Sequence, residues 1–164
     1  MLLRWSIRCA LLCYAAVLAN DVGIWQGSRT GRRRLWTLGC GLFLVHTLAA
    51  FAVHDWRHAA ALRHTAERTE ALVGWRFGGG LYFNYLFALL WLGDVCWSWI
   101  AAATYVRRRP RWTCLLHVYM GFIAVNGAIL FAAGPTRPIG FVVVALLLLL
   151  RLRHLPGKKK TLPT

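Results

Sequence analysis

Long apolar runs separated by short basic connections dominate this sequence. Five runs stand out, at residues 2–22, 35–54, 81–106, 112–133 and 139–155. At a helical rise of ~1.5 Å per residue they extend for ~25 to ~39 Å, near or above the ~30 Å needed to cross the hydrocarbon of a bilayer. Backbone polar groups in lipid must bond within their own segment, so these runs favour helices. The pattern predicts an all-α integral membrane protein, a bundle of five transmembrane helices.

The connection at residues 55–76 is long for a helical hairpin and has a pattern of its own. It is rich in alanine, and Arg63 and Glu67 form an i,i+4 pair of opposite sign. Three glycines, at residues 78–80, follow it. We predict an extramembrane helix here, either a surface helix or an extension of the second span, ending at a flexible glycine joint. The whole then forms one transmembrane domain, residues 1–155, with a basic tail at residues 156–164.

Composition supports lipid as the solvent of these runs. Apolar residues make up 59% of the 164 residues, and the mean hydropathy is +0.51. A soluble domain of this composition is improbable. The net charge of +15 is not spread along the chain as in a nucleic-acid-binding protein, because the basic residues cluster between the apolar runs. The sequence therefore predicts the lipid bilayer as a partner and excludes nucleic acid.

The basic clusters also predict an orientation. They lie after the first and third runs and at the end of the fifth, so five spans place them all on one side, which the positive-inside rule makes cytoplasmic. The clusters contain thirteen of the twenty Lys and Arg residues: Arg29, Arg32, Arg33, Arg34, Arg107, Arg108, Arg109, Arg111, Arg151, Arg153, Lys158, Lys159 and Lys160. We predict a location in the plasma (inner) membrane, with the N-terminus outside and the C-terminus in the cytoplasm.

The first run has an alternative interpretation that reduces the count to four spans. Residues 17–19 before Asn20 resemble a signal-peptide cleavage site, and the run is also compatible with an in-plane helix. Cleavage after Ala19 would place the cluster at residues 29–34 outside. That outcome contradicts the charge rule, so five spans is the favoured count.

Asp94 is the most informative single residue, since it falls in the middle of the third run. A carboxylate at the bilayer centre costs roughly 2.5 to 3.5 kcal/mol on insertion scales. It marks either a proton, ion or ligand site or a hydrogen-bonded structural residue that fastens helices together. Asn84 and Trp91 lie on the same helix, with spacings that predict an inward polar and aromatic seam.

Depth along the helices predicts partners for Asp94. Counted from the cytoplasmic end of each run, Asp94 lies at ~18 Å, His46 at ~16 Å and Asn126 at ~21 Å. We therefore predict a midplane cluster of these three residues. A neutral or proton-sharing His and Asp pair lowers the cost of burying either side chain.

The other histidines raise the question of a cofactor. His54 and His58 have the i,i+4 spacing of two metal ligands on one helix face, with His64 nearby, although histidines on a water-facing helix explain the pattern more simply. His46 and His117 are candidate ligands of haem b, but their predicted depths differ by ~9 Å. The sequence therefore leaves a metal or haem b open without favouring either.

The absence of known catalytic motifs shapes the functional prediction. The sequence has no Walker loop, HExxH or nucleophile elbow. We predict a non-catalytic bundle that binds a partner subunit or a small ligand around a buried Asp/His centre. Such a thin bundle is expected to form a homo-oligomer or to join a larger membrane complex. Two alternatives stay open: proton or solute translocation through Asp94, and a His-ligated metal or haem redox protein or enzyme.

Overall fold

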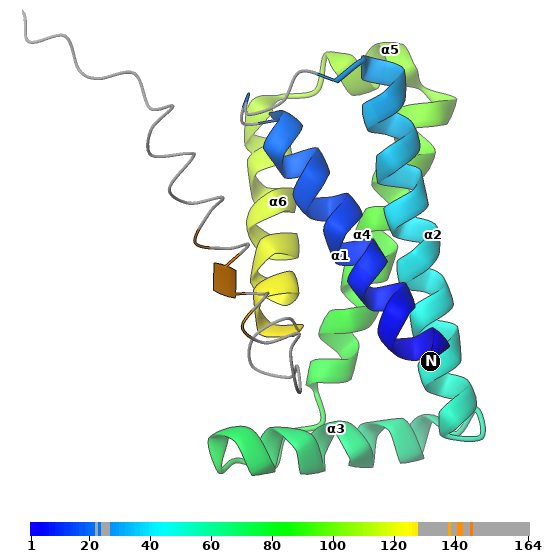
Figure 1. Cartoon of the computed structure of the whole chain (residues 1–164), viewed down its shortest axis with the longest axis vertical. Coiled ribbons are helices and arrows are strands. Elements are labelled where there is room, and N and C mark those ends of the chain that lie inside the picture. The colour runs from blue at the N-terminus through cyan, green and yellow to red at the C-terminus, as the bar shows by residue number, and fades with distance from the viewer. Residues whose placement is uncertain (22, 24–26, 128–137, 139–140, 143–144, 146–164) are drawn as a thin grey trace, which may run out of the picture.

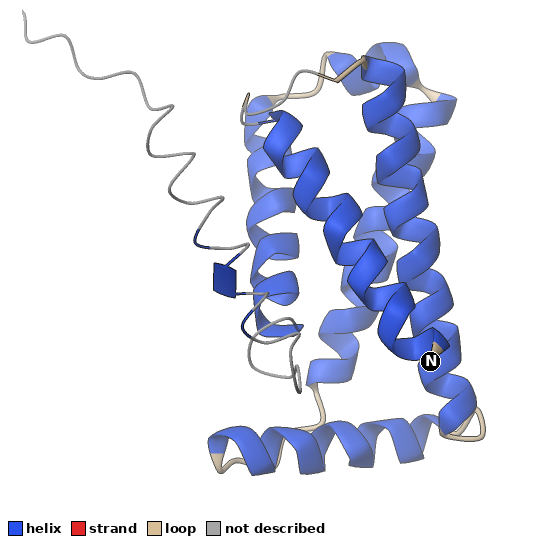
Figure 2. Ribbon diagram, in the orientation of Figure 1, coloured by secondary structure: helices blue, strands red, loops and turns tan. Residues whose placement is uncertain are grey.

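The computed structural model describes residues 1–21, 23, 27–127, 138, 141–142 and 145. Within this part of the chain, every regular element is a helix (Figure 2). In chain order the elements are α1 (Leu2–Asp21), α2 (Arg29–Val53), α3 (His58–Val73), α4 (Gly80–Ile100), α5 (Ala102–Val106) and α6 (Pro110–Val125). The predicted all-helical class is confirmed for these residues.

Three of the helices, α1, α2 and α4, are long and apolar enough to cross a membrane. With 20, 25 and 21 residues they extend for ~30, ~37 and ~31 Å. The described helix in the fourth apolar run, α6, has 16 residues, or ~24 Å. Residues 128–133 of that run and most of the run at residues 139–155 lie outside the described residues. The count of five spans therefore stays a prediction.

Two helix ends differ from the apolar runs. The second helix begins at Arg29, six residues before the apolar run, because Ser28 caps it: the Ser28 hydroxyl accepts from the Gly31 N–H at 3.0 Å. The third run extends to residue 106, but α4 ends at Ile100. There Ala101 leaves the helical region, with φ −130° and ψ 55°, and the chain turns into α5.

The α3 helix is separate from α2 and lies across one end of the bundle, at a steep angle to the long helices (Figure 1). The change of direction occurs at residues 54–57, where Asp55 and Trp56 have positive φ values of 50° and 58°. At its other end, Gly74 adopts the left-handed conformation (φ 73°) and its N–H bonds the Glu70 carbonyl. This helix lies within residues 55–76, the segment predicted to form an extramembrane helix.

The core lies where α1, α2, α4 and α6 meet, and it is largely aromatic. Trp36 and Trp91 are almost fully buried, with ring centroids 4.9 Å apart. Gly39 permits this packing, since a Cβ there would lie 2.8 Å from the Trp91 ring and 3.0 Å from the Cys13 Cβ. Outside the core, large apolar side chains such as Leu48 and Leu89 are exposed. Exposed apolar side chains of this kind are compatible with contact to lipid.

Candidate functional site

Charged side chains gather at the end of the bundle where α1 and α4 end and where α2 and α6 begin, the upper end in Figure 1. We call this the charged end. It contains eight arginines and two aspartates: Arg29, Arg32, Arg33, Arg34, Arg107, Arg108, Arg109, Arg111, Asp21 and Asp94. The other acidic residues, Asp55, Glu67 and Glu70, belong to α3 and the turn before it, at the opposite end.

Asp94 is buried at this end and bonded to three other segments. The Trp36 indole Nε1–H donates to its Oδ2 at 2.9 Å, and the Tyr105 hydroxyl donates to the same oxygen at 2.8 Å. The Arg108 guanidinium forms an ion pair with Oδ1. The Asp94 side chain is only 7% exposed and that of Arg108 10% exposed. A carboxylate buried to this extent requires such paired, charge-assisted bonds.

The turn at Ala101 brings residues that follow α4 in sequence within reach of Asp94. Tyr105 lies 11 residues after Asp94, and Arg108 lies 14 residues after it. On a continuous helix Tyr105 would stand ~16 Å further along the axis. Because α4 ends and the chain folds back through α5, both side chains reach the carboxylate. Tyr105 lies outside the three candidate spans, and burial raises the pKa of its hydroxyl, which therefore keeps its proton for donation.

Asp94 therefore lies closer to the charged end than the sequence predicted. It stands six residues, or ~9 Å, before the end of α4. Its partner Trp36 stands seven residues, or ~10 Å, after the start of α2, which is the matching level. The predicted depth of ~18 Å assumed a helix that continued to residue 106.

The structure does not bring His46 and Asp94 together. The His46 Nδ1 lies 2.9 Å from the Leu3 carbonyl oxygen, at the start of α1. On α2, His46 is ten residues from Trp36, or ~15 Å further from the charged end. The predicted pairing is corrected for this reason: Asp94 bonds Trp36, Tyr105 and Arg108, whereas His46 bonds a backbone carbonyl.

The remaining members of the predicted polar cluster lie at different levels. Trp91 is in the aromatic core, and its indole N–H has no hydrogen-bond partner among the described residues. Asn84 is exposed near the start of α4. The Asn126 side-chain amide donates to the Phe122 carbonyl at 2.7 Å, at the end of α6. Only Trp91 adjoins the Asp94 cluster, through its packing on Trp36.

A second carboxylate, Asp21, fastens α1 to α2. It receives two bonds from the Arg32 guanidinium, each of 2.5 Å, in the bidentate geometry that arginine favours. The His117 Nε2 on α6 lies 3.5 Å from Asp21 Oδ2, and the Tyr14 hydroxyl donates to the His117 carbonyl at 3.1 Å. Asp21 and Arg32 retain 24% and 20% side-chain exposure, so water still screens this pair.

The two carboxylate groups are parts of one cluster. Trp36, which bonds Asp94, also packs against Tyr14 and His117, at centroid distances of 5.9 and 5.7 Å. Tyr105, which bonds Asp94, interacts electrostatically with Arg32, the partner of Asp21. The cluster joins the end of α1, the start of α2, the end of α4 and α6. The cluster is suited to holding these segments together, because each carboxylate bonds a cation from another segment.

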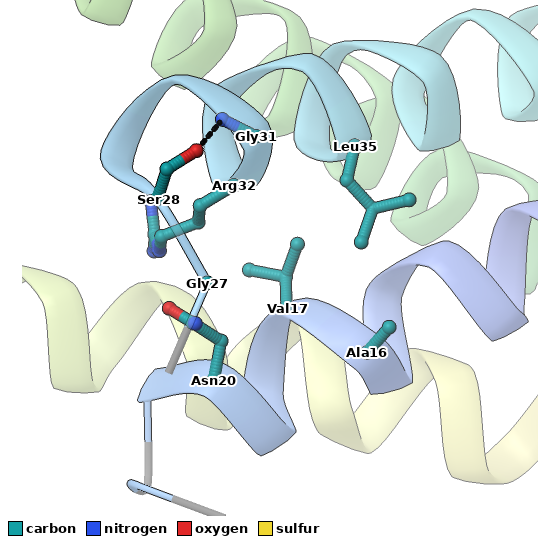
Figure 3. A pocket seen from close by; sticks show the side chains of 8 residues that line it. All are labelled: Ala16, Val17, Asn20, Gly27, Ser28, Gly31, Arg32 and Leu35. Atoms are coloured by element: carbon teal, nitrogen blue, oxygen red, sulfur yellow. Dashed lines mark hydrogen bonds between the residues drawn. The ribbon is translucent and has the colours of Figure 1, made fainter. Parts of the chain in front are cut away.

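Two hollows adjoin the charged end. The smaller, of about 120 Å³, lies between α1 and α2, where the side chains of Val17 and Leu35 point toward one another (Figure 3). Arg32 and Asn20 also line it, and the Ser28 cap stands beside them. The larger is an open groove of about 450 Å³ between α4 and α6. Its lining residues are Leu89, Leu90, Gly93, Asp94, Trp97, Arg108, Trp112, Leu115 and Leu116.

The histidines near α3 do not converge as the metal hypothesis required. Because α2 ends at Val53 and α3 begins at His58, His54 and His58 do not share a helix face. The rings of His54 and His64 lie 4.9 Å apart, whereas the His58 Nδ1 lies 3.0 Å from the Tyr85 hydroxyl. Within the described part of the chain, no group of three or more His, Cys, Asp or Glu is placed to hold a metal ion.

The two candidate haem ligands lie at opposite ends of α1. His46 contacts Leu3 and His117 contacts Asp21, which are 18 residues or ~27 Å apart along that helix. Two axial histidines must face each other across one haem. The structure therefore corrects this hypothesis, because the bundle does not bring His46 and His117 to one level.

Sequence reasoning selected Asp94 but missed the residues that bond it, as well as the Asp21 pair. A signal was present, since Asp21 and Asp94 are two of only five acidic residues and both lie within 15 residues of an arginine cluster. Comparison of the chain with protein families, with curated proteins and with solved structures finds no match in any of the three.

Proposed function

We propose that this chain is a small multi-pass integral membrane protein of non-catalytic role, a helical bundle that binds a partner subunit or a small ligand within the membrane. Three helices with the length and composition of membrane spans support membrane insertion. The exposed apolar side chains on α2, α4 and α6 support lipid and protein contacts around the bundle.

The observation that carries the non-catalytic role is the bonding of Asp94. Its two carboxylate oxygens are engaged by α2, by α5 and by the segment between α5 and α6. An acid that binds and releases protons or substrates needs an oxygen that water or a ligand can reach. A buried carboxylate with an arginine, an indole and a phenol around it instead holds three segments in place.

The distribution of charge supports an orientation for this bundle. Eight arginines against two aspartates at the charged end favour the cytoplasmic side of the inner membrane. On this proposal the N-terminus and α3 lie on the outer side. Few described residues are buried inside this thin bundle. The proposal therefore includes association with a second copy of the chain or with another subunit.

Reporter fusions test the membrane placement. Alkaline phosphatase and green fluorescent protein, each fused after Arg34, Val73 and Arg109 in separate chains, report the compartment of each site. We expect Arg34 and Arg109 to report the cytoplasm and Val73 the outside. Different compartments for Arg34 and Arg109, or a chain that stays dissolved without detergent, would overturn the proposal.

A second function, proton or solute translocation, is favoured by one observation: Asp94 and Arg108 line the open groove between α4 and α6. The Asp94→Asn variant separates the two functions in proteoliposomes loaded with a pH-sensitive dye. Translocation predicts proton flux for the unchanged chain and none for the variant, at equal folded amounts. The fastening role predicts no flux for either chain and a less stable variant.

A further inference from the structure

The open groove between α4 and α6, hereafter the α4–α6 groove, has apolar walls and a charged end. Leucine side chains at positions 89, 90, 115 and 116 form the walls, with Gly93 between them. Arg108 and Asp94 stand at the polar end, and Trp97 and Trp112 flank them. Both tryptophans are exposed. The lining thus changes from hydrocarbon-like to charged over a short distance.

The dimensions of the groove match the upper part of an acyl chain. Along α4 the lining extends from Leu89 to Trp97, or ~12 Å, and along α6 from Trp112 to Leu116, or ~6 Å. Trp97 lies three residues, or ~4.5 Å, before the end of α4, and Trp112 lies two residues after the start of α6, so the polar end is near the level at which lipid headgroups begin. Tryptophan favours this level of a membrane.

The arginines at the polar end of the groove indicate which class of lipid headgroup it favours. Asp94 engages one side of the Arg108 guanidinium, which carries five N–H donors in total. The neighbouring Arg107, Arg109 and Arg111 are exposed, and the Arg111 guanidinium lies 5.9 Å from the centre of the Trp112 ring. This end is strongly cationic, so a negatively charged headgroup gains more than a zwitterionic one.

We propose that the α4–α6 groove binds an anionic phospholipid. The phosphate lies against Arg108 and Arg111, and the first methylenes of one acyl chain lie along Gly93 and the leucine walls. This inference rests on the proposed membrane placement and names a ligand for the bundle. It accounts for an open apolar groove that ends at a cation cluster in a chain surrounded by lipid.

The chain offers a matched pair of glycines for a steric test. A Cβ built on Gly93 meets nothing within 4 Å, so a Leu side chain at this position starts in open space and occupies part of the groove. Gly41 on α2 has the same open surroundings and does not line the groove, so Gly41→Leu is the control. Arg111→Gln removes an exposed charge beside Trp112, which lines the groove, and Arg34→Gln removes an exposed charge from α2 at the same end.

Native mass spectrometry in dodecyl maltoside measures the lipid retained by the full-length chain, with phosphatidylglycerol and phosphatidylcholine of identical acyl chains as probes. We expect preferential retention of phosphatidylglycerol. Arg111→Gln should weaken that retention about fivefold, the effect of one arginine near an anionic surface. Gly93→Leu should weaken it about tenfold by displacing about two methylenes. Gly41→Leu and Arg34→Gln should change it less than twofold.

Three results would overturn the inference. One is equal retention of the two lipids, and another is equal retention by Gly93→Leu and Gly41→Leu. The third is a lower melting temperature of Gly93→Leu, and not of Gly41→Leu, in lipid-free detergent, since a segment of this chain or a second copy would then fill the groove. Each of these results leaves the reporter-fusion outcome unchanged, so failure of the lipid inference is distinct from failure of the membrane placement.

Discussion

Replacement of Asp94 by Asn tests whether this carboxylate fastens the bundle. Asn preserves the shape of the side chain and one carbonyl oxygen, which still accepts from Trp36 or Tyr105. It removes the negative charge beside Arg108, whose side chain is only 10% exposed. The guanidinium then faces an amide that does not neutralise it, and the ion pair between α4 and the segment after α5 is lost.

The burial of the pair sets the size of the effect. Loss of one member of a buried ion pair costs about 3–5 kcal/mol, since the other charge is left unpaired. Asp94 lies ~9 Å before the end of α4, where water is closer than at the middle of a span, so we expect the lower limit, about 3 kcal/mol. Arg108→Met should cost about 2 kcal/mol, because Trp36 and Tyr105 still donate to the carboxylate. The double variant leaves no unpaired charge, so its cost should fall below the sum by about 2 kcal/mol.

The assay is reversible unfolding of the purified chain in dodecyl maltoside by added dodecyl sulfate, followed by far-ultraviolet circular dichroism. The exposed ion pair between Glu70 and Arg76, at 3.9 Å, supplies a control, and Glu70→Gln should change the free energy of unfolding by less than ~0.5 kcal/mol. A free energy for Asp94→Asn within ~0.5 kcal/mol of the unchanged chain would refute the fastening role. So would additive costs in the double variant.

Three further changes probe the core and the cluster by the same unfolding assay. Asp21→Asn should cost only about 1 kcal/mol, since water screens its pair with Arg32, and a cost above that of Asp94→Asn would contradict this ranking. Gly39→Ala should cost about 1–3 kcal/mol, because it forces a methyl group against Trp91. Gly41→Ala meets open space and should be neutral or stabilising. Equal effects of the two changes would argue against the close approach of α2 and α4. Tyr105→Phe should cost about 1.5–3 kcal/mol through its lost bond to the carboxylate, and an unchanged free energy would place Tyr105 away from Asp94.

The helices themselves were largely predictable because apolar runs and their polar boundaries determine where lipid-compatible segments begin and end. The first run, residues 2–22, matches α1 to within one residue, since the apolar pattern stops at Asn20 and Asp21. The end of α4 was not predictable in this way. Residues 101–103 are alanines, which favour helix. The pattern of apolar and polar residues does not indicate that a helix ends at Ala101. The bonds from Tyr105 and Arg108 to Asp94 are tertiary, and they depend on the chain turning there.

The same error explains the incomplete prediction of the site. The cost of burying a carboxylate identified Asp94 without knowledge of any partner. The partners of Asp94 were predicted from the depth of each residue along its helix. A helix end misplaced by six residues shifts that depth by ~9 Å, which is enough to pair Asp94 with His46 rather than with Trp36. Tryptophan is common at membrane boundaries, a role that needs no specific bond, so the sequence does not single out Trp36, and Arg32 is one of four arginines at residues 29–34. Neither pattern reveals which single side chain bonds a carboxylate.

Because the chain turns at Ala101, the order of synthesis determines when Asp94 acquires its hydrogen-bond donors. When α4 leaves the ribosome, Trp36 has already been synthesised, but Tyr105 and Arg108 follow Asp94 by 11 and 14 residues. A nascent chain that stops at residue 100 therefore carries a carboxylate with one of its three donors. In a membrane-inserted chain, Asp94 therefore has all three donors only after Tyr105 and Arg108 have been synthesised, so full pairing of this carboxylate waits for the segment that follows α4.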